Sequence, residues 1–280
     1  IGDIYEVSQG FTRDAWIIKA DLSGCFPNIR QEVAYSQLEE VIKEDYEGKD
    51  KDELIYMLNV CVYSYPTHHC YRKSGLEKWE KIAPHKSLFN KPDGVGAAIG
   101  HLIWQNAVNY YFHEIDEWLM SMDVRFERFV DDFAFVVQDK TAFLAYTMPE
   151  LRRRLAALGA RLNEDKFYCQ HYTKGVEWIG CHIKMDRIYP NRRIVGRGME
   201  KARRLNRRIT PGRVERALST LNSYMGICKN ANGLNQAMRI VRTLSEGWQR
   251  YIAFNRHRVC YEALPAYSYR NRIIHKYHLK

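Results

Sequence analysis

Apolar runs along the first two thirds of the chain predict the strands of one sheet. The run Trp16–Asp21 ends in a carboxylate and predicts a buried strand. Residues 125–138 form two runs that meet at Asp131 and Asp132, so they predict a β-hairpin with both arms facing the core. Further short strands are predicted at residues 161–162, 167–170 and 176–184. Together with the helices described next, these strands favour an α+β chain with an antiparallel sheet.

Apolar residues spaced three and four positions apart predict the helices. These helices cover residues 30–43, 53–65, 97–120, 149–158, 199–208, 214–225 and 234–254. The last third of the chain is therefore predicted to be helical throughout. Residues 66–97 are rich in Pro, Gly, Lys and His and lack such a period, so they predict an irregular insertion.

The composition is that of a folded globular protein. The 280 residues are 46% hydrophobic and 27% charged, which excludes a disordered tail or a fibre. No apolar run approaches the ~20 residues that cross a bilayer, so no membrane partner is expected. The seven cysteines include no Cys-x-x-Cys pair, which argues against a disulfide framework and favours a reducing cytoplasm. The run His68-His69-Cys70 invites a zinc site, but its spacing matches no structural zinc motif.

Charge is divided unevenly along the chain. The whole sequence carries 43 basic and 33 acidic residues, a net charge of +10. Residues 190–280 hold 20 basic residues, most of them arginines, and only four acidic ones, so this part is +16 and the remainder is −6. A basic third beside an acidic remainder favours binding of a polyanion such as nucleic acid, whereas solvated helical faces are the alternative.

Three aspartates are the strongest candidates for chemistry. Asp21 ends an apolar strand, and Asp131 and Asp132 lie at the tip of the predicted hairpin. Adjacent carboxylates raise each other's pKa unless a cation binds between them. Mg²⁺ prefers such oxygen ligands, and two ions ~3.5–4 Å apart can activate a 3′-hydroxyl for phosphoryl transfer. The alternative is that Asp-Asp is an ordinary turn dipeptide.

Five segments, in this order, resemble the conserved motifs of reverse transcriptases. They are Lys19–Ile29, Gly96–Gln105, Phe129–Asp132, Leu158–Lys166 and Gly175–Gly180. The resemblance implies a right-hand polymerase architecture, with residues 1–185 as the palm and part of the fingers and residues 186–280 as a helical, Arg-rich thumb. Only about fifteen residues precede the first strand, so we expect most of the N-terminal fingers to be missing from this sequence.

The resemblance also implies catalytic roles for five residues. Asp21 and Asp131 would be the main metal ligands, with Asp132 nearby and the backbone carbonyl of Leu22 as a further ligand. Two Mg²⁺ ions are the implied cofactor, with Mn²⁺ as a substitute. Lys166 matches the motif lysine that gives a proton to leaving pyrophosphate, a role that favours a lowered lysine pKa; the alternative is a solvated lysine.

Other matched positions imply contacts with nucleotide and nucleic acid. Phe26 matches the steric gate against a 2′-hydroxyl, although its spacing also suits a core aromatic residue. Gly100 and Gln105 match positions beside the nascent base pair, and a plain helix-surface amide is the alternative for Gln105. Trp178 and Gly180 match the primer grip, where Trp178 could equally be hairpin core. The arginines expected to follow a phosphate backbone are Arg203, Arg204, Arg207 and Arg208.

Within this family the chain most resembles bacterial enzymes of diversity-generating retroelements and related antiviral defence systems. The shared features are Lys86–Phe89, Gln170–Gly175 and Ser223–Gly226. His101 and Trp104 depart from the branch pattern, and Trp104 is expected beside the nucleotide, where it would change what fits.

The expected function is RNA-directed DNA polymerase activity, with primer extension from deoxynucleoside triphosphates in the bacterial cytoplasm. The expected partners are an RNA template or structured non-coding RNA, the DNA product and an accessory protein. A maturase-like RNA-binding scaffold without synthesis is the alternative. A two-metal nuclease would share the three carboxylates but would not need Phe26 and Gln105.

Overall fold

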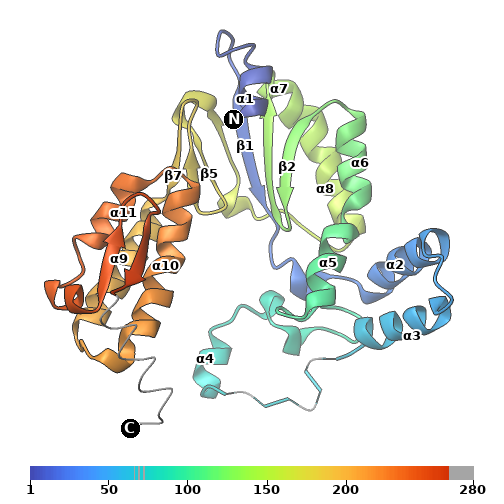
Figure 1. Cartoon of the computed structure of the whole chain (residues 1–280). Coiled ribbons are helices and arrows are strands. Elements are labelled where there is room, and N and C mark those ends of the chain that lie inside the picture. Colours follow the sequence, from blue (N-terminus) through green and yellow to red (C-terminus); the bar gives the residue numbers. More distant parts are fainter. Residues whose placement is uncertain (66, 69, 72, 265–280) are drawn as a thin grey trace. The chain divides into compact units, whose positions relative to one another are not determined.

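The computed structural model describes residues 1–65, 67–68, 70–71 and 73–264. They belong to two compact units, one covering Gly2–His171 and the other starting at Tyr172 (Figure 1). Each unit has its own hydrophobic core. The boundary between palm and thumb after residue 185 is a division by function and stays a prediction.

The first unit is built on a four-stranded antiparallel sheet with the order β2-β3-β1-β4. The strands are β1 (Trp16–Asp21), β2 (Arg125–Phe129), β3 (Asp132–Val137) and β4 (Tyr168–His171). The first strand has the predicted boundaries, and it lies between β3 and β4. Its side chains Ile17, Ile18 and Ala20 are all buried, so both faces of this strand are covered. The antiparallel sheet expected from the sequence is thereby confirmed.

The predicted hairpin at residues 125–138 forms, but one of its arms differs from the prediction. Strand β2 is an edge strand, and its residues alternate between exposed and half-buried, with Arg125, Glu127 and Phe129 exposed. Only β3 contributes fully buried residues such as Phe133 and Phe135. The expectation of two core-facing arms was therefore wrong, because an edge strand of this sheet keeps one face in solvent.

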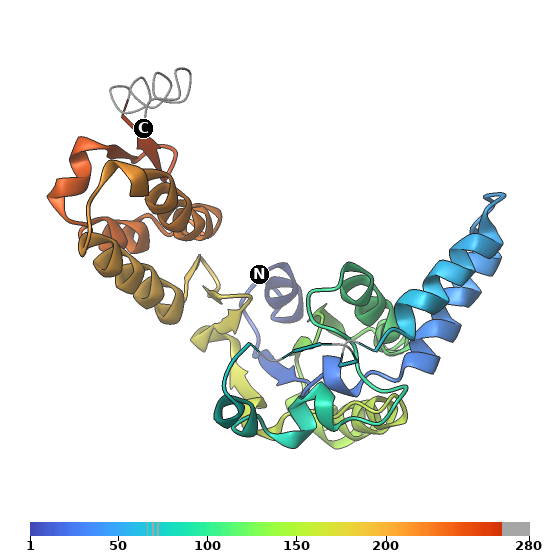
Figure 2. The ribbon, with the colours of Figure 1, turned by 90° about the horizontal axis from the view of Figure 1, so that it is seen from below.

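Eight α-helices belong to the described part of the first unit. They are α1 (Gly2–Val7), α2 (Gln31–Asp45), α3 (Lys51–Val62), α4 (Leu76–Glu80), α5 (Leu102–Tyr111), α6 (His113–Ser121), α7 (Lys140–Ala142) and α8 (Met148–Ala157). Of these, α2, α3, α5, α6 and α8 share one core with the sheet. Tyr111 of α5, Leu119 of α6 and Leu155 of α8 are fully buried. Their burial together with β1 and β3 fixes the sheet that carries the candidate site. Helices α2 and α3 lie side by side and extend from this body (Figure 2).

The single helix predicted over residues 97–120 is instead two helices with a late start. Gly96 and Gly100 have left-handed φ values of +112° and +95°, which a helix cannot include. Helix α5 therefore begins only at Leu102, and Phe112 separates it from α6. The insertion at 66–97 holds α4 and two 3₁₀ turns but is otherwise irregular as expected. Pro66, His69 and Arg72 lie outside the described residues, and with them part of the rejected zinc run.

The second unit combines helices with two small antiparallel sheets. Its elements are β5 (Val176–Trp178), β6 (Cys181–Ile183), β7 (Ile188–Pro190), α9 (Arg192–Asn206), α10 (Val214–Asn230), α11 (Leu234–Val241), β8 (Ile252–Asn255) and β9 (Cys260–Ala263). Helix α9 begins earlier than predicted because the Asn191 side chain caps it, accepting a bond from the Ile194 N–H at 2.9 Å. The prediction of an entirely helical last third was wrong, since Ile252 and Tyr261 are buried in the paired strands β8 and β9.

All seven cysteines are free, as the sequence predicts. In the part of the chain that the structure describes, no helix combines the length and the apolar character of a membrane-spanning segment.

Candidate active site

The register of β1 with β3 brings the three aspartates together. Asp21 at the end of β1 lies directly opposite Asp132, the first residue of β3. One position further on, the Leu22 N–H donates to the Asp131 carbonyl at 2.9 Å, so the hairpin tip stays attached to the end of β1. Because antiparallel pairing fixes which residues face each other, the predicted convergence of the strand end and the hairpin tip is present.

A strained turn presents Asp131. Phe129 and Asp132 pair across the hairpin, and Val130 between them has a φ of +58°. A β-branched residue rarely adopts this conformation, which costs about 1–3 kcal/mol and is typical of functional sites. Arg128 supports the turn, since its guanidinium donates to the Val130 carbonyl at 3.2 Å and pairs with Asp116. Sequence reasoning missed Arg128, because β2 also carries Arg125 and Glu127 and nothing in its sequence distinguishes Arg128 from these exposed charges.

The electrostatics of the site are those of crowded negative charge. Burial raises the pKa of Asp131, and the nearby charges of Asp21 and Asp132 raise it further. Burial also raises the pKa of the Cys25 thiol to about 12, with Asp131 as the next contribution. Protons or cations are therefore attracted to this end of the sheet.

Two lysines occupy the carboxylates in this structure. Lys166 Nζ lies 2.8 Å from Asp21 Oδ2, and Lys19 Nζ lies 3.3 Å from Asp132 Oδ1. Asn163 adds a longer contact of 3.4 Å to the same Asp21 oxygen. The hydrogen bond to Asp21 raises the pKa of Lys166, whereas the proton-donor role favours a lowered one. The pKa of Lys166 is raised because an ion pair with a buried carboxylate stabilises the charged form of the lysine.

The donor set fits a hard divalent cation by its chemistry, because all of its ligands are oxygens. Asp21 is buried, while Asp131 has a raised pKa that a bound cation would relieve. As the side chains stand, no three His, Cys, Asp or Glu residues in the described ranges converge tightly enough to hold a metal ion. The ion pairs with Lys166 and Lys19 account for this arrangement, since each lysine holds one carboxylate.

The segment with Phe26 and the glycine motif lie side by side. Phe26 opens a 3₁₀ turn (Phe26–Asn28), and its carbonyl accepts the Ala97 N–H at 2.8 Å. The position of Gly96 favours glycine because its φ of +112° is one that side-chain-bearing residues rarely adopt, and a Cβ there would also displace the Leu88 side-chain end, 2.5 Å away. Gly100 has open space around it. Phe26 itself is half-buried against the core, so a ring at this position belongs partly to the core and partly to the surface.

Helix α5 separates the two residues that were expected to face the nucleotide. Gln105 is exposed on the helix, as its predicted role requires. Trp104 is only 2% exposed and belongs to the core cluster that includes Val108. The expectation that Trp104 would alter the nucleotide site was therefore wrong, since neighbouring positions on a helix point about 100° apart. His101, the other departure from the branch pattern, is exposed.

The predicted primer-grip residues lie in the second unit, on the hairpin of β5 and β6. Trp178 ends β5, and Gly180 has a left-handed φ of +78° in the turn. The left-handed φ favours glycine at Gly180, and a Cβ there would also push on the Ile194 side-chain end of α9, 2.5 Å away. Ile179 at the tip is half exposed. The primer-grip role of these residues stays a prediction.

The predicted phosphate-binding arginines are all exposed on or just after α9. Arg204 pairs with Glu200 along the helix. The earlier start of α9 adds further cations to the same solvent-facing side, which sequence reasoning missed because it placed the helix start at residue 199. The added cations are Arg192, Arg193 and Arg197.

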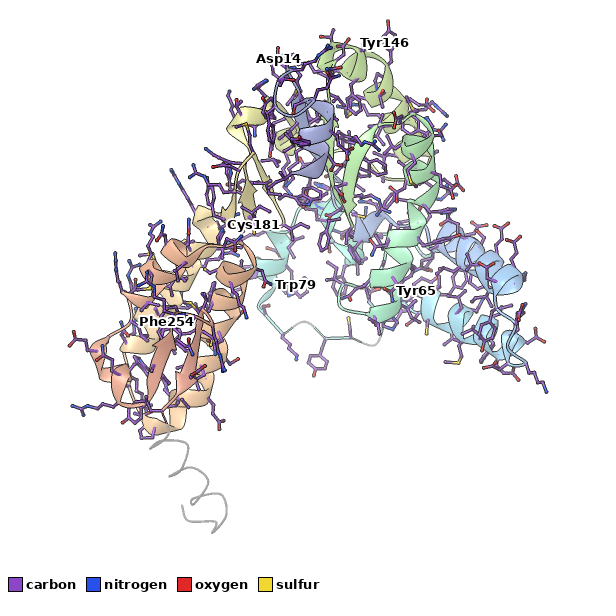
Figure 3. All side chains as sticks on the ribbon, turned by 45° about the horizontal axis from the view of Figure 1, so that its top comes forward. Asp14, Tyr65, Trp79, Tyr146, Cys181 and Phe254 are labelled. Carbon is purple, nitrogen blue, oxygen red and sulfur yellow. The ribbon has the colours of Figure 1, made fainter. Side chains whose placement is uncertain are left out.

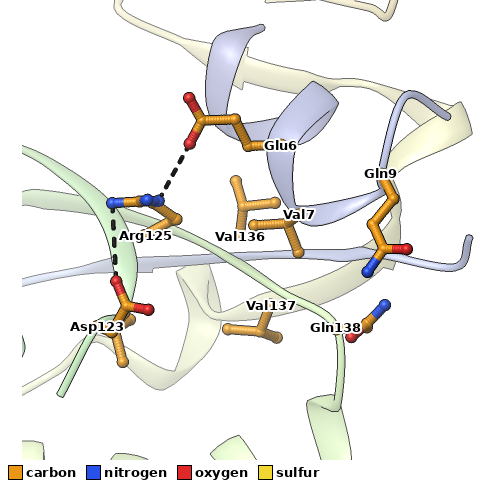
Figure 4. A pocket seen from close by; sticks show the side chains of 9 residues that line it. Glu6, Val7, Gln9, Asp123, Arg125, Val136, Val137 and Gln138 are labelled. Carbon is orange, nitrogen blue, oxygen red and sulfur yellow. Dashed lines mark ion pairs between the residues drawn. The ribbon is translucent and has the colours of Figure 1, made fainter.

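A pocket of about 380 Å³ lies at the far end of β2 and β3 from the carboxylates (Figure 4). Its cation, Arg125, lies 3.2 Å from Glu6 and 3.8 Å from Asp123. These carboxylates neutralise Arg125, so the pocket offers no obvious anion site.

The sheet with acidic residues at its strand ends, covered by helices, is the fold of a reverse transcriptase domain. Residues 7–183 match the family model described as reverse transcriptase (RNA-dependent DNA polymerase). This match spans more than half of the chain, so the chain belongs to the reverse transcriptase family. No curated protein matches it.

A solved structure with a TM-score of 0.50 supports the same fold, and a second one has a lower score. The structure of apo telomerase from Candida tropicalis superposes with a TM-score of 0.50 at 15% identity, over 89% of this chain and 44% of that one. Telomerase from Candida albicans, solved with the TWJ fragment of telomeric RNA, gives a TM-score of 0.45 at 15% identity, over 88% and 47% of the two chains. The chain therefore spans less than half the length of these telomerases.

Proposed function

We propose that this chain is the polymerase module of an RNA-directed DNA polymerase, which extends a primer 3′-hydroxyl with deoxynucleoside triphosphates. The observation that carries the proposal is the placement of Asp21 opposite Asp132, with Asp131 on the adjoining strained turn. Membership of the reverse transcriptase family supports the same reaction.

In this proposal Asp21, Asp131, Asp132 and the Leu22 carbonyl would hold two Mg²⁺ ions, which Mn²⁺ could replace. When bound, the ions supply activation of the 3′-hydroxyl and neutralisation of the leaving pyrophosphate oxygens. Lys166 Nζ lies 2.8 Å from Asp21 Oδ2, and a cation bound at Asp21 would weaken the contact that raises the pKa of Lys166. Lys166 is thus placed to give a proton to a phosphate oxygen that arrives beside Asp21.

The remaining assignments concern substrate selection. Phe26 is proposed to exclude a 2′-hydroxyl, and Gly100 and Gln105 to contact the nascent base pair. The close approach of the Phe26 segment to the glycine motif supports a shared role at one substrate. In the second unit, Trp178 and Gly180 are proposed to position the primer, and the exposed α9 arginines to follow a phosphate backbone.

The biological setting is proposed from the branch-like segments alone. A bacterial cytoplasmic retroelement or antiviral defence system would supply a structured non-coding RNA as template, and an accessory protein would assist. Sequencing of the RNA that co-purifies, and of the DNA made from it, would separate the two settings.

The test of the activity is incorporation of labelled deoxynucleotides on a primed RNA template with Mg²⁺. The double substitution Asp131→Asn/Asp132→Asn should lower the rate at least about 100-fold, because charge stabilisation is lost at the reacting centre. Asp123→Asn, in an exposed position just before the same hairpin, is the matched control and should keep full activity. Equal rates for wild type and the double variant would refute the site. Tight RNA binding with no incorporation would favour the scaffold function. The ion pairs of Lys166 with Asp21 and of Lys19 with Asp132 are also compatible with that function.

A further inference from the structure

The hairpin of α2, its connecting turn and α3, called here the α2–α3 hairpin (residues 31–62), is attached to the body through α2. Helix α2 packs against α5, and α3 packs against α2. Both views show the two helices extending away from the sheet (Figures 1 and 2). Leu58 and Val62 of α3 are buried on the side that faces the core.

The opposite side of α3 is also apolar but is exposed. Tyr56, Met57 and Val60 are 70%, 61% and 53% exposed, and we call these three residues the α3 stripe. Their spacing of one and four positions places them on one helical face. A helix that is apolar on opposite sides is normally buried on both. Exposed apolar groups that cluster in this way mark an interaction surface.

The hairpin that carries the stripe is acidic, and α3 itself carries Asp52 and Glu53 in its first turn, just before the stripe. Residues 31–62 hold nine acidic side chains against three lysines, a net charge of −6. Glu53 lies one turn before Met57 on the same face.

This charge decides what can cover the stripe. A phosphate backbone would be repelled, so nucleic acid does not fit. A symmetric dimer through two stripes would bring two surfaces of charge −6 together, which like-charge repulsion opposes. Cations on the occupant would be attracted instead, and apolar residues at helical spacing would bury the stripe.

We propose that the α3 stripe and the carboxylates of its hairpin form a docking surface for a basic amphipathic helix of a second protein. The docking surface itself does not depend on the polymerase function. Only the description of the second protein as an accessory of a polymerase rests on that proposed function. Apolar anchors would supply most of the affinity, and the flanking lysines or arginines of the partner would set orientation and association rate.

The test measures binding of a probe peptide to the full chain by fluorescence anisotropy, without metal or nucleotide. The probe is a peptide of leucines and lysines of about 15 residues, long enough to form a helix, with its leucines at helical spacing. The triple substitution Tyr56→Gln/Met57→Gln/Val60→Gln should weaken binding about tenfold or more. The matched control is Tyr146→Gln, which removes an equally exposed ring from the outer surface of the same unit (Figure 3) and should leave the affinity unchanged.

Two further measurements separate the contributions of charge and apolar contact. Glu53→Lys should also weaken binding of the lysine peptide, because it replaces an attractive charge by a repulsive one. This variant remains informative if the triple variant folds poorly. A peptide with glutamates in place of the lysines should not bind. Equal affinity of the lysine peptide for wild type and the triple variant, or binding of the glutamate peptide, would overturn the proposal.

The other occupants give distinct results. A dimer of the full chain in sedimentation velocity that the triple substitution abolishes would identify a second copy instead. Loss of affinity for an RNA oligonucleotide in the triple variant would assign the surface to nucleic acid. Either result would overturn the proposal. A chain that binds the peptide as expected but incorporates no deoxynucleotide would instead count only against the polymerase function.

Discussion

Arg128 shows how one buried side chain can hold in place the turn that carries Asp131. Its side chain is 8% exposed, and it bonds the Val130 carbonyl, the Asn109 carbonyl and Asp116. Removal of one partner of a buried ion pair leaves the other charge uncompensated. The conformation of the turn that carries Asp131 therefore depends on a residue that is not itself a candidate for chemistry.

Arg128→Met is expected to lower the free energy of unfolding by about 3 kcal/mol, because Asp116 loses its partner. Arg128→Lys should lie between wild type and Arg128→Met, since lysine keeps the charge but loses the forked geometry. Urea unfolding measures both. Arg125→Met on the same strand is the control, with a loss of at most about 1 kcal/mol because Arg125 forms only surface pairs. An equal loss for the Arg128 and Arg125 variants would contradict the supporting role.

At the scale of single elements, helix α8 shows how the sequence predicts a helix and how ion pairs in its first turn stabilise it. Helix α8 is close to the predicted span: it ends at Ala157, and Gly159 just beyond it has a φ of +75°. Its first turn carries Glu150, which pairs with Arg153 and Arg154. These bonds, the one from Arg153 foremost, lower the pKa of Glu150 to about 2.

The stability given by Glu150 should therefore depend on pH. A carboxyl whose pKa is lowered on folding stabilises the native state above its unfolded value of 4.5, and this effect is lost as the pH falls toward about 2. Glu150→Gln should thus have a lower melting temperature than wild type at pH 7, and the gap should close between pH 4.5 and about 2. Thermal unfolding followed by circular dichroism across this range tests the expectation. A gap that is constant with pH would show that the ion pairs contribute nothing.

At the scale of the whole molecule, the division of charge found in the sequence corresponds to separate surfaces. The exposed side of α9 in the second unit is rich in arginine, whereas the α2–α3 hairpin in the first unit carries a net charge of −6. Phosphate contacts release counterions and so make binding dependent on salt. The basic surface, rather than the acidic one, should therefore govern affinity for nucleic acid.

The triple substitution Arg203→Gln/Arg207→Gln/Arg208→Gln should weaken binding of single-stranded RNA. It should also reduce the slope of log affinity against log salt by about two, at about 0.7 per phosphate contact. Filter binding or anisotropy at several salt concentrations measures this slope. Replacement of the three lysines of the α2–α3 hairpin by glutamine removes the same charge and should leave the slope unchanged. The assignment of α9 would be wrong if both variants behaved alike.

The sequence by itself determined the strand that carries Asp21, the hairpin that carries Asp131 and Asp132, and the motif order of a reverse transcriptase domain. These features are local, since alternation, turn residues and short motifs are visible in a few neighbouring positions. The same local information placed Trp104 beside the substrate and made residues 252–254 helical, and both expectations were wrong.

Only the tertiary structure decided which face each element turns inward and which charges meet. It placed Trp104 in the core, paired Lys166 with Asp21 and buried Arg128 beneath the turn. It also left the α3 stripe exposed, although its sequence alone resembles a buried helix. These outcomes depend on contacts between residues far apart in the chain, and the free energy of such contacts is not contained in any single segment.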